Sequence, residues 1–421
     1  MSQSYKPISL IVAAIITLSL PLAGHANASD LHQGARTKQR VEGLYTDSLE
    51  AASYFQQGVM RYNRKEFKGA EMAFRKALEF DPYIPMARYL LGNSLFQQGQ
   101  IELAAEQYRL AVGLDPNLAE AHYNLGLMLY RQGQLDEAIA SYQQALSLNP
   151  NSAAARYNLG LAFEAQGQVE QALAQYNEAI RLDPNYAVAQ YNLGLLLAKQ
   201  DQLEPAITAL RQAIRTSPNL VQGHYQLGLL LTQQGQVEEA KNSFLTALKL
   251  NSKFAPAHYQ LGILFVQQGN LEEAIRRFEW ATQLEPENVE AYRQLGAALT
   301  QNGNYDKAAI ALQTAIRLEP DNALTHYNLA VALHRSQQYD AAIAEYEEAI
   351  LLNPKLSLAF YNMGIALQQS GRGTEATSFL LEARNLFIQE GNLEKIDELE
   401  QYLNQLNASP TSVTQPAGVS N

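Results

Sequence analysis

Residues 119–152 read AEAHYNLGLMLYRQGQLDEAIASYQQALSLNPNS, and this stretch decides the fold. Its second half carries an apolar stripe at helical spacing, formed by Leu135, Ala138, Ile139, Tyr142, Ala145 and Leu146. Its first half carries another stripe, formed by Ala121, Leu125, Gly126 and Leu129. Gly133 is placed to end the first helix in the left-handed conformation, and Pro150 ends the second because proline lacks an N–H group. The stretch predicts two antiparallel helices, which we call helix A and helix B.

The same pattern recurs every 34 residues. Prolines mark the period at residues 82, 116, 150, 184, 218, 286, 320 and 354, and Ser252 takes the place at the missing step. If each proline is counted as position 32 of a repeat, ten repeats fill residues 51–390. They are residues 51–84, 85–118, 119–152, 153–186, 187–220, 221–254, 255–288, 289–322, 323–356 and 357–390.

Small residues keep the same register in these repeats. Alanine occupies position 20 in all ten, from Ala70 to Ala376, and position 27 in all ten, from Ala77 to Ala383. Glycine occupies position 8 in nine repeats, and Ala330 is the exception. Small side chains let helix axes approach closely, and a larger one would overpack the interface. We therefore expect these positions to be buried between helices.

The run AHYNLG at residues 121–126, followed by Ala138, Tyr142, Ala145 and Pro150, resembles the tetratricopeptide repeat (TPR). The resemblance covers residues 51–390 and implies an all-α, right-handed α-solenoid, in which helix A of every repeat lines a concave groove. Where this family often has a large aromatic residue at position 4, four repeats have histidine instead. These are His122, His224, His258 and His326, and we expect them to have a structural role at an inter-helix seam.

Both ends of a repeat stack need polar caps. Residues 391–407 are expected to form a C-terminal capping helix, and Leu393, Ile396, Leu399, Leu403 and Leu406 are its apolar face. The pattern-free residues 408–421 are expected to be disordered. Repeat one is basic, and its six basic residues are Arg61, Arg64, Lys65, Lys68, Arg75 and Lys76. We interpret it as a solvated N-terminal cap, and the alternative is a basic patch for an acidic partner.

The N-terminus has the features of an export signal. Lys6 precedes an apolar run over residues 8–23, and the small residues Ala26 and Ala28 suit signal peptidase. We expect a signal peptide over residues 1–28 and a lead-in segment over residues 29–50. The alternative is an uncleaved anchor, but the run is shorter than the ~20 residues of a spanning helix. We therefore expect an exported bacterial protein, located in the periplasm, the thylakoid lumen or the extracellular space. After cleavage of the signal peptide we expect no stable membrane insertion.

Composition excludes several classes of function. The chain has no cysteine, which excludes disulfide scaffolds, thiolate metal sites and cysteine nucleophiles. Its 31 Lys and Arg against 42 Asp and Glu give a formal charge of −11. This charge repels phosphate backbones, so we expect no nucleic-acid partner.

The sequence carries no catalytic signature. It lacks a phosphate-binding loop, a His-Glu-x-x-His motif, a calcium loop and a nucleophile elbow. The position-4 histidines are whole repeats apart and cannot converge on one zinc ion at ~2 Å. We expect no metal, no cofactor and no enzyme activity. Some TPR proteins carry a glycosyltransferase domain after the repeats, and we expect none here because the sequence after repeat ten is too short for one.

The predicted groove carries a periodic set of polar and apolar side chains. Position 6 is Asn or Gln in nine repeats, position 5 is mostly Tyr and position 9 is mostly aliphatic. A carboxamide both donates and accepts, so one per repeat can bond to the backbone of an extended peptide. The candidate peptide-binding residues are Tyr123, Asn124, Leu127, Tyr157, Asn158, Leu161, Tyr191, Asn192, Leu195, Gln226, Gln260, Asn328 and Asn362. The alternative is that Tyr packs on the next repeat and Asn is merely solvated.

These features predict a non-enzymatic scaffold that binds extended segments of partner proteins and assists assembly of envelope, pilus, secretion or lumenal complexes. Two alternatives stay open. One is a structural homo-oligomer, and the other is a non-catalytic subunit of an enzyme complex such as a glycosyltransferase.

Overall fold

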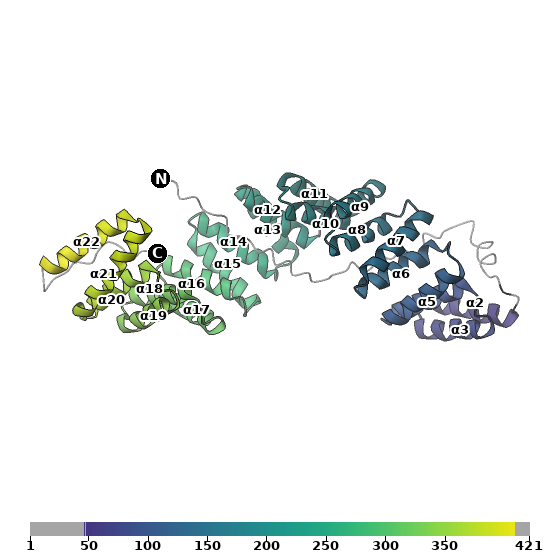
Figure 1. The fold of residues 1–421 in the computed structure, drawn as a ribbon, viewed down its shortest axis with the longest axis horizontal. Helices are drawn as coiled ribbons and strands as arrows, with labels where there is room; N and C mark the ends of the chain where they lie inside the picture. The colour runs from purple at the N-terminus through teal and green to yellow at the C-terminus, as the bar shows by residue number, and fades with distance from the viewer. Residues whose placement is uncertain (1–45, 47, 409–421) are drawn as a thin grey trace. The chain divides into compact units, whose positions relative to one another are not determined.

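The computed structural model describes residue 46 and residues 48–408. This part of the chain contains 21 helices and no strand, as the all-α prediction requires. Figure 1 shows these helices in chain order. The expected signal peptide (residues 1–28), most of the lead-in segment (residues 29–50) and all but the first residue of the expected tail (residues 408–421) lie outside the described residues.

The chain consists of two compact units, and the boundary between them lies between Asp183 and Pro184. From here on, "unit" means one of these two bodies and "repeat" means a 34-residue helix pair. The first unit holds repeats one to four, as helices α2 (Leu49–Asn63), α3 (Phe67–Phe80), α4 (Pro85–Gln97), α5 (Ile101–Leu114), α6 (Ala119–Arg131), α7 (Leu135–Leu148), α8 (Ala153–Ala165) and α9 (Val169–Leu182). The second unit begins with repeats five to seven, as α10 (Ala187–Lys199), α11 (Leu203–Thr216), α12 (Val221–Gln233), α13 (Val237–Leu250), α14 (Ala255–Gln267) and α15 (Leu271–Leu284). It continues with α16 (Val289–Gln301), α17 (Tyr305–Leu318), α18 (Ala323–Arg335), α19 (Tyr339–Leu352), α20 (Ser357–Gln369), α21 (Gly373–Glu390) and α22 (Leu393–Ala408).

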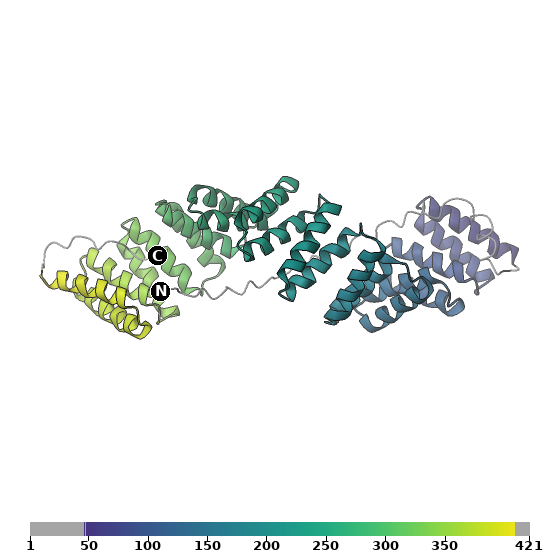
Figure 2. The same cartoon turned by 90° about the horizontal axis from the view of Figure 1, so that it is seen from above.

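Each repeat is a pair of helices that lie side by side, as Figures 1 and 2 show. Within a unit, each B helix also contacts the A helix of the next repeat. Some A helices touch directly across repeats, for example α6 with α8 in the first unit and α16 with α18 in the second. The A helices therefore form the inner side of each unit, as the TPR resemblance implies.

Position 8 is glycine because the B helix places a large side chain against it. A Cβ atom on Gly126 would lie 2.8 Å from the ring of Tyr142. The other eight glycines at this position meet a Phe, Tyr or Leu sixteen residues further on, at less than 3.0 Å in every case. The alanines at position 20, from Ala70 to Ala376, are all fully buried. The predicted small-residue register is confirmed.

The turn between helices A and B has the same backbone conformation in all ten repeats. Gly133 has φ of 75°, in the left-handed region that the sequence predicts for it. Lys65, Asp201 and Gln337 occupy the equivalent position with φ of 61°, 57° and 64°. Packing of the two helices therefore imposes this turn even where glycine is missing, at a cost of about 1–2 kcal/mol per residue.

Proline is one of several ways in which the B helices end. Helix α13 ends at Leu250 although Ser252 replaces the proline, and the Asn251 side chain accepts a hydrogen bond from the Lys253 backbone N–H at 3.1 Å. In repeat ten the apolar Phe387 takes the place of the polar residues that precede position 32 elsewhere. Helix α21 then continues to Glu390 and ends at a left-handed Gly391.

The C-terminal capping helix is present, but one part of its predicted apolar face is wrong. Leu399 is fully buried against the end of the second unit, whereas Leu393 is 73% exposed. Six residues separate them, which is well short of two helical turns, so they point in different directions. Tyr402, which the sequence analysis missed, is only 3% exposed and takes part in this face. Ile396 and Leu403 pack against the same cluster, and the side chain of Leu406 lies outside the described residues.

The first repeat has polar residues at two positions that are apolar or small in the other repeats, and its role as a cap stays a prediction. Ser53 and Gln57 stand at positions 3 and 7, where the other repeats have buried or half-buried small and aliphatic residues. Helix α2 begins at Leu49, two residues earlier than the predicted repeat, because the Ser48 hydroxyl accepts from the Ala51 N–H at 3.1 Å. The six basic residues of this repeat are exposed, and two of them pair with glutamates of their own helix.

We predict that Gly126→Val lowers the free energy of unfolding by about 1–3 kcal/mol, because the new side chain collides with Tyr142. The matched control is Gly113→Val in helix α5, where nothing lies within 4 Å of an added Cβ atom. Urea unfolding followed by circular dichroism measures both. Equal midpoints for the two variants would show that position 8 tolerates bulk.

Candidate functional site

The predicted groove residues lie on the A helices of both units. Positions 5, 6, 9 and 12 share one side of an A helix because residues three, four and seven apart are neighbours on a helix. We call this the inner face. The first unit contributes α6 and α8, and the second unit contributes α10, α12, α14, α18 and α20. The unit boundary thus falls between Asn158 and Asn192, so the row predicted through repeats three to five is divided.

Three position-6 amides, those of Asn124, Asn158 and Asn362, bond to the preceding repeat. The Asn158 amide donates both to the Tyr123 hydroxyl, at 2.9 Å, and to the Ala154 carbonyl, at 3.0 Å. Tyr123 belongs to the preceding repeat, so this bond ties α8 to α6. In the second unit the Asn362 amide donates to the Tyr327 hydroxyl at 2.9 Å. We call this contact, from the position-6 amide of one repeat to the position-5 hydroxyl of the repeat before it, the amide latch.

Neighbouring contacts extend this arrangement. The Asn124 amide donates to the Asn93 side-chain oxygen at 3.0 Å, and the Tyr108 hydroxyl donates to the same oxygen at 2.7 Å. Burial raises the pKa of Tyr225, and a hydrogen bond from Gln260 acts against that rise. The same balance of burial and an amide hydrogen bond applies to Tyr123 with Asn158. These phenols therefore stay neutral, and their oxygens accept the amide N–H groups.

Burial removes several predicted residues from the accessible surface. Asn362 is fully buried, Tyr157 is 2% exposed and Leu127 is 7% exposed. They cannot contact a partner in this structure, because neighbouring repeats cover them. The remaining candidates are half-buried and keep part of their surface free: Tyr123, Asn124, Asn158, Leu161, Tyr191, Asn192, Leu195, Gln226, Gln260 and Asn328.

An aromatic row on the inner face was missed by the sequence analysis. Position 12 is Tyr62, Phe96 and Tyr130 in repeats one to three, and all three side chains are half-buried. The Arg131 guanidinium lies over the Phe96 ring, 5.0 Å from its centroid. Burial raises the pKa of Tyr62 and of Tyr130. The signal was available in the sequence, since these aromatics lie three residues after position 9 and therefore on the same side of the helix.

The position-4 histidines have the predicted structural role. Their Nε2 atoms contact the position-32 carbonyl oxygen that closes the preceding repeat, which joins successive repeats. The pairs are His122 with Pro116, His224 with Pro218, His258 with Ser252 and His326 with Pro320, at 2.9–3.1 Å. Within the described residues, no three His, Asp or Glu side chains are grouped so that they could hold a metal ion.

His334 is a buried titratable group between repeats nine and ten. It is 4% exposed, and its Nε2 lies 2.8 Å from Gln369 Oε1. Burial lowers its pKa, a hydrogen bond to Gln369 opposes the change, and the charge of Arg335 lowers the pKa further. Burial lowers the pKa of His258 as well. Both imidazoles are therefore neutral in the folded chain at neutral pH.

We predict that acid destabilises the second unit through His334. The unfolded chain binds the extra proton near pH 6.5, its ordinary value, while the folded chain resists it to lower pH. The contribution of neutral His334 to the free energy of unfolding is complete above that pH. It is lost as the pH falls towards the pKa of His334 in the folded chain. Urea unfolding at pH 7.5 and 5.5 should show a smaller loss for His334→Gln than for the wild type. An equal loss in the two proteins would contradict the assignment.

We predict that Tyr123→Phe lowers the free energy of unfolding by about 0.5–1.5 kcal/mol, because the Asn158 amide loses its partner across the seam. The ring and its packing are retained. Tyr83→Phe is the control, because Tyr83 is 72% exposed in the same unit. Thermal melts decide the result, and a Tyr123→Phe melt that coincides with the control would remove the amide latch from the account.

Comparisons with known families agree with this fold. Residues 92–133 match a model described as TPR repeat, and residues 301–357 match one described as tetratricopeptide repeat. Residues 117–323 match the model of the cilia and flagella-associated protein 70 C-terminal domain. The helix pairs and these matches define a repeat solenoid. The chain belongs to the tetratricopeptide-repeat family.

Solved structures are similar to parts of the chain. A crystal structure of MamA is 28% identical over 38% of this chain and 94% of its own, with a TM-score of 0.37. YrrB, titled a TPR protein with an unusual peptide-binding site, is 25% identical over 44% of this chain and 96% of its own, with a TM-score of 0.40. PilF of Pseudomonas aeruginosa is 24% identical over 52% of this chain and 96% of its own, with a TM-score of 0.44. No curated protein sequence matches the chain.

Proposed function

We propose that this TPR protein is an exported, non-catalytic scaffold that binds extended segments of other proteins along its inner faces. On this proposal it assists the assembly of envelope, pilus, secretion or lumenal complexes. Membership of the TPR family supports a role in protein–protein interaction. None of the helices within residues 48–408 has the length and apolar character needed to cross a membrane.

The observation that carries the proposal is the accessible aromatic and amide surface of the first unit. Phe96 and Tyr130 expose part of their rings beside Tyr123 and Asn158 on the same inner face. Aromatic rings give large contact area at low entropic cost, and such residues dominate binding energy at interfaces. A run of apolar side chains on a partner would find its contacts here.

The amide latch also defines what the amides can offer a ligand. Both N–H groups of Asn158 are already donated within the chain, so its side-chain oxygen is the atom left for a partner. An acceptor of this kind suits a backbone N–H group of an extended segment. We therefore propose that the inner face binds one edge of an extended peptide, and that the backbone N–H groups of the peptide are the donors.

Affinity capture tests this proposal in the compartment to which the protein is exported. The double variant Phe96→Ala with Tyr130→Ala should recover bound partners with about tenfold or more lower affinity, because buried aromatic anchors dominate such interfaces. The matched control is Tyr83→Ala, an exposed tyrosine that lies outside the inner face. Circular dichroism melts check that both variants fold. Unchanged recovery by the folded double variant would reject the inner face of the first unit as the binding surface.

Export has a separate test. We expect N-terminal sequencing of the protein from its native source to begin at Ser29, because cleavage after Ala28 is proposed from the small residues before it. A protein that begins at Met1 and is recovered from the cytosol would contradict the proposed location, and would leave the binding proposal standing.

A further inference from the structure

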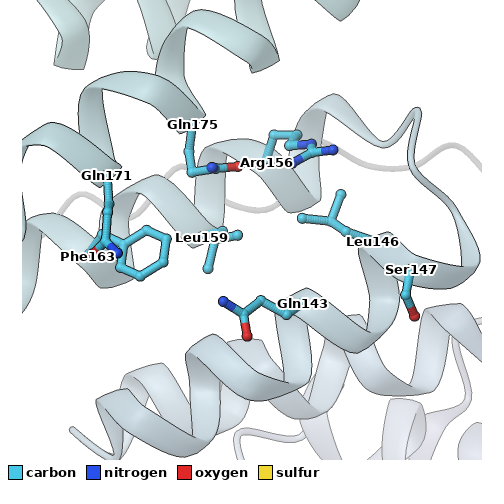
Figure 3. Close-up of a pocket in the computed structure, with 8 residues that line it drawn as sticks. All are labelled: Gln143, Leu146, Ser147, Arg156, Leu159, Phe163, Gln171 and Gln175. Atoms are coloured by element: carbon cyan, nitrogen blue, oxygen red, sulfur yellow. Dashed lines mark hydrogen bonds between the residues drawn. The ribbon is translucent and has the colours of Figure 1, made fainter.

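A pocket of about 440 Å³ lies between repeats three and four, away from the inner face. Figure 3 shows it open between α7 and the α8–α9 pair. Leu159 and Phe163 of α8 form an apolar wall, Gln143 comes from α7, and Gln171 and Gln175 come from α9. Arg156 extends along the upper edge of the pocket, and the oxygen of Gln175 is directed at it.

Two other seams carry an ion pair at the equivalent place. Arg109 and Glu137 meet across repeats two and three at 3.3 Å, and Arg211 and Glu239 meet across repeats five and six at 2.7 Å. These are position 25 of one repeat and position 19 of the next. Between repeats three and four the two positions are Gln143 and Gln171. Neither glutamine has a hydrogen-bond partner among the described residues, so no polar contact joins these two positions where the pocket lies.

Arg156 is incompletely bonded within the chain. Its Nη1 donates to Gln175 Oε1 at 3.1 Å, while its Nε is buried without an acceptor. Its Nη2 also has no acceptor among the described residues and is not buried, so it is the donor that an incoming oxygen can use. Glu178 is close enough to feel the charge of Arg156, but Glu178 is paired with Arg181 at 2.7 Å. These three groups leave one net positive charge beside the pocket.

We propose that this pocket binds a single carboxylate side chain, Asp or Glu, on a segment of a partner protein. The Arg156 guanidinium takes the carboxylate, since it offers planar N–H donors that suit two oxygens. The carboxamides of Gln143 and Gln171 add N–H donors, and Leu159 and Phe163 contact the methylene groups. One carboxylate fits better than an acidic run, because the whole chain carries a formal charge of −11.

This site is separate from the inner face and makes the protein bivalent. The pocket is lined by α7 and α9, which are B helices, and by positions 4, 7 and 11 of α8, whereas the proposed peptide surface uses positions 5, 6, 9 and 12 of the A helices. The two surfaces can therefore fail or succeed independently. A partner that used both would gain affinity through linkage of two weak contacts.

The probe for the test is N-acetylglutamate N-methylamide, which carries one side-chain carboxylate and mimics a residue within a chain. Its isosteric control is N-acetylglutamine N-methylamide. Nuclear magnetic resonance titration of the mature chain should show saturable shifts at Arg156 and Gln171 with the first probe and not with the second. Arg156→Gln should weaken the binding about tenfold or more. Glutamine suits this position, since Gln190 occupies it in repeat five and donates to the Pro184 carbonyl at 2.6 Å.

A second variant keeps Arg156 and closes the pocket. Gln143→Arg with Gln171→Glu installs the ion pair found between repeats two and three and between repeats five and six, and should abolish the shifts without loss of stability. Arg64→Gln, which removes an equal charge from an exposed site of the same unit, should leave binding unchanged. Equal shifts with the glutamine probe, or binding that survives in both pocket variants, would overturn the proposal. If free glutarate bound more tightly than N-acetylglutamate N-methylamide, the proposal would also be overturned, in favour of a site for small carboxylates.

Discussion

The close approach of the two helices within each repeat is the constraint on which the rest of the structure depends. Gly126 leaves room for the Tyr142 ring, and the fully buried alanines at position 20 let the neighbouring helices approach. A helix pair of this size cannot bury its own apolar faces, so it has to stack on a copy of itself. The 34-residue period repeats this contact, and through it the positions of the turns, the seams and the exposed inner face.

The fold could be predicted from sequence because its determinants are local and repeated. Glycine and alanine at fixed positions fix the helix spacing, and Gly133 specifies a turn whose conformation is the same in every repeat. Leu393 and Tyr402 were misjudged because the capping helix has no repeated register to guide it. Its buried side depends on how α22 rests on α21, which spacing alone does not determine.

The candidate site was only partly predictable, for a different physical reason. The type and spacing of Asn158 indicate a polar row, but its amide bonds to a hydroxyl 35 residues earlier in the chain. That partner is known only once two repeats are stacked. The pocket beside Arg156 has the same origin, because its lining residues come from three helices of two repeats and meet only once those repeats are stacked. Repetition predicts the scaffold, and departures from repetition mark the places where it can bind.

The Asn158 and Asn362 amides donate across seams between repeats, and at Asn158 this leaves only the side-chain oxygen for a partner. Hydrogen exchange of the side-chain NH2 groups, followed by nuclear magnetic resonance on the free protein, tests these contacts most directly. The account predicts slow exchange at Asn158 and Asn362, which donate across seams, and fast exchange at the exposed Asn151. Exchange at Asn158 and Asn362 as fast as at Asn151 would show that the amides are free in solution and would contradict the account.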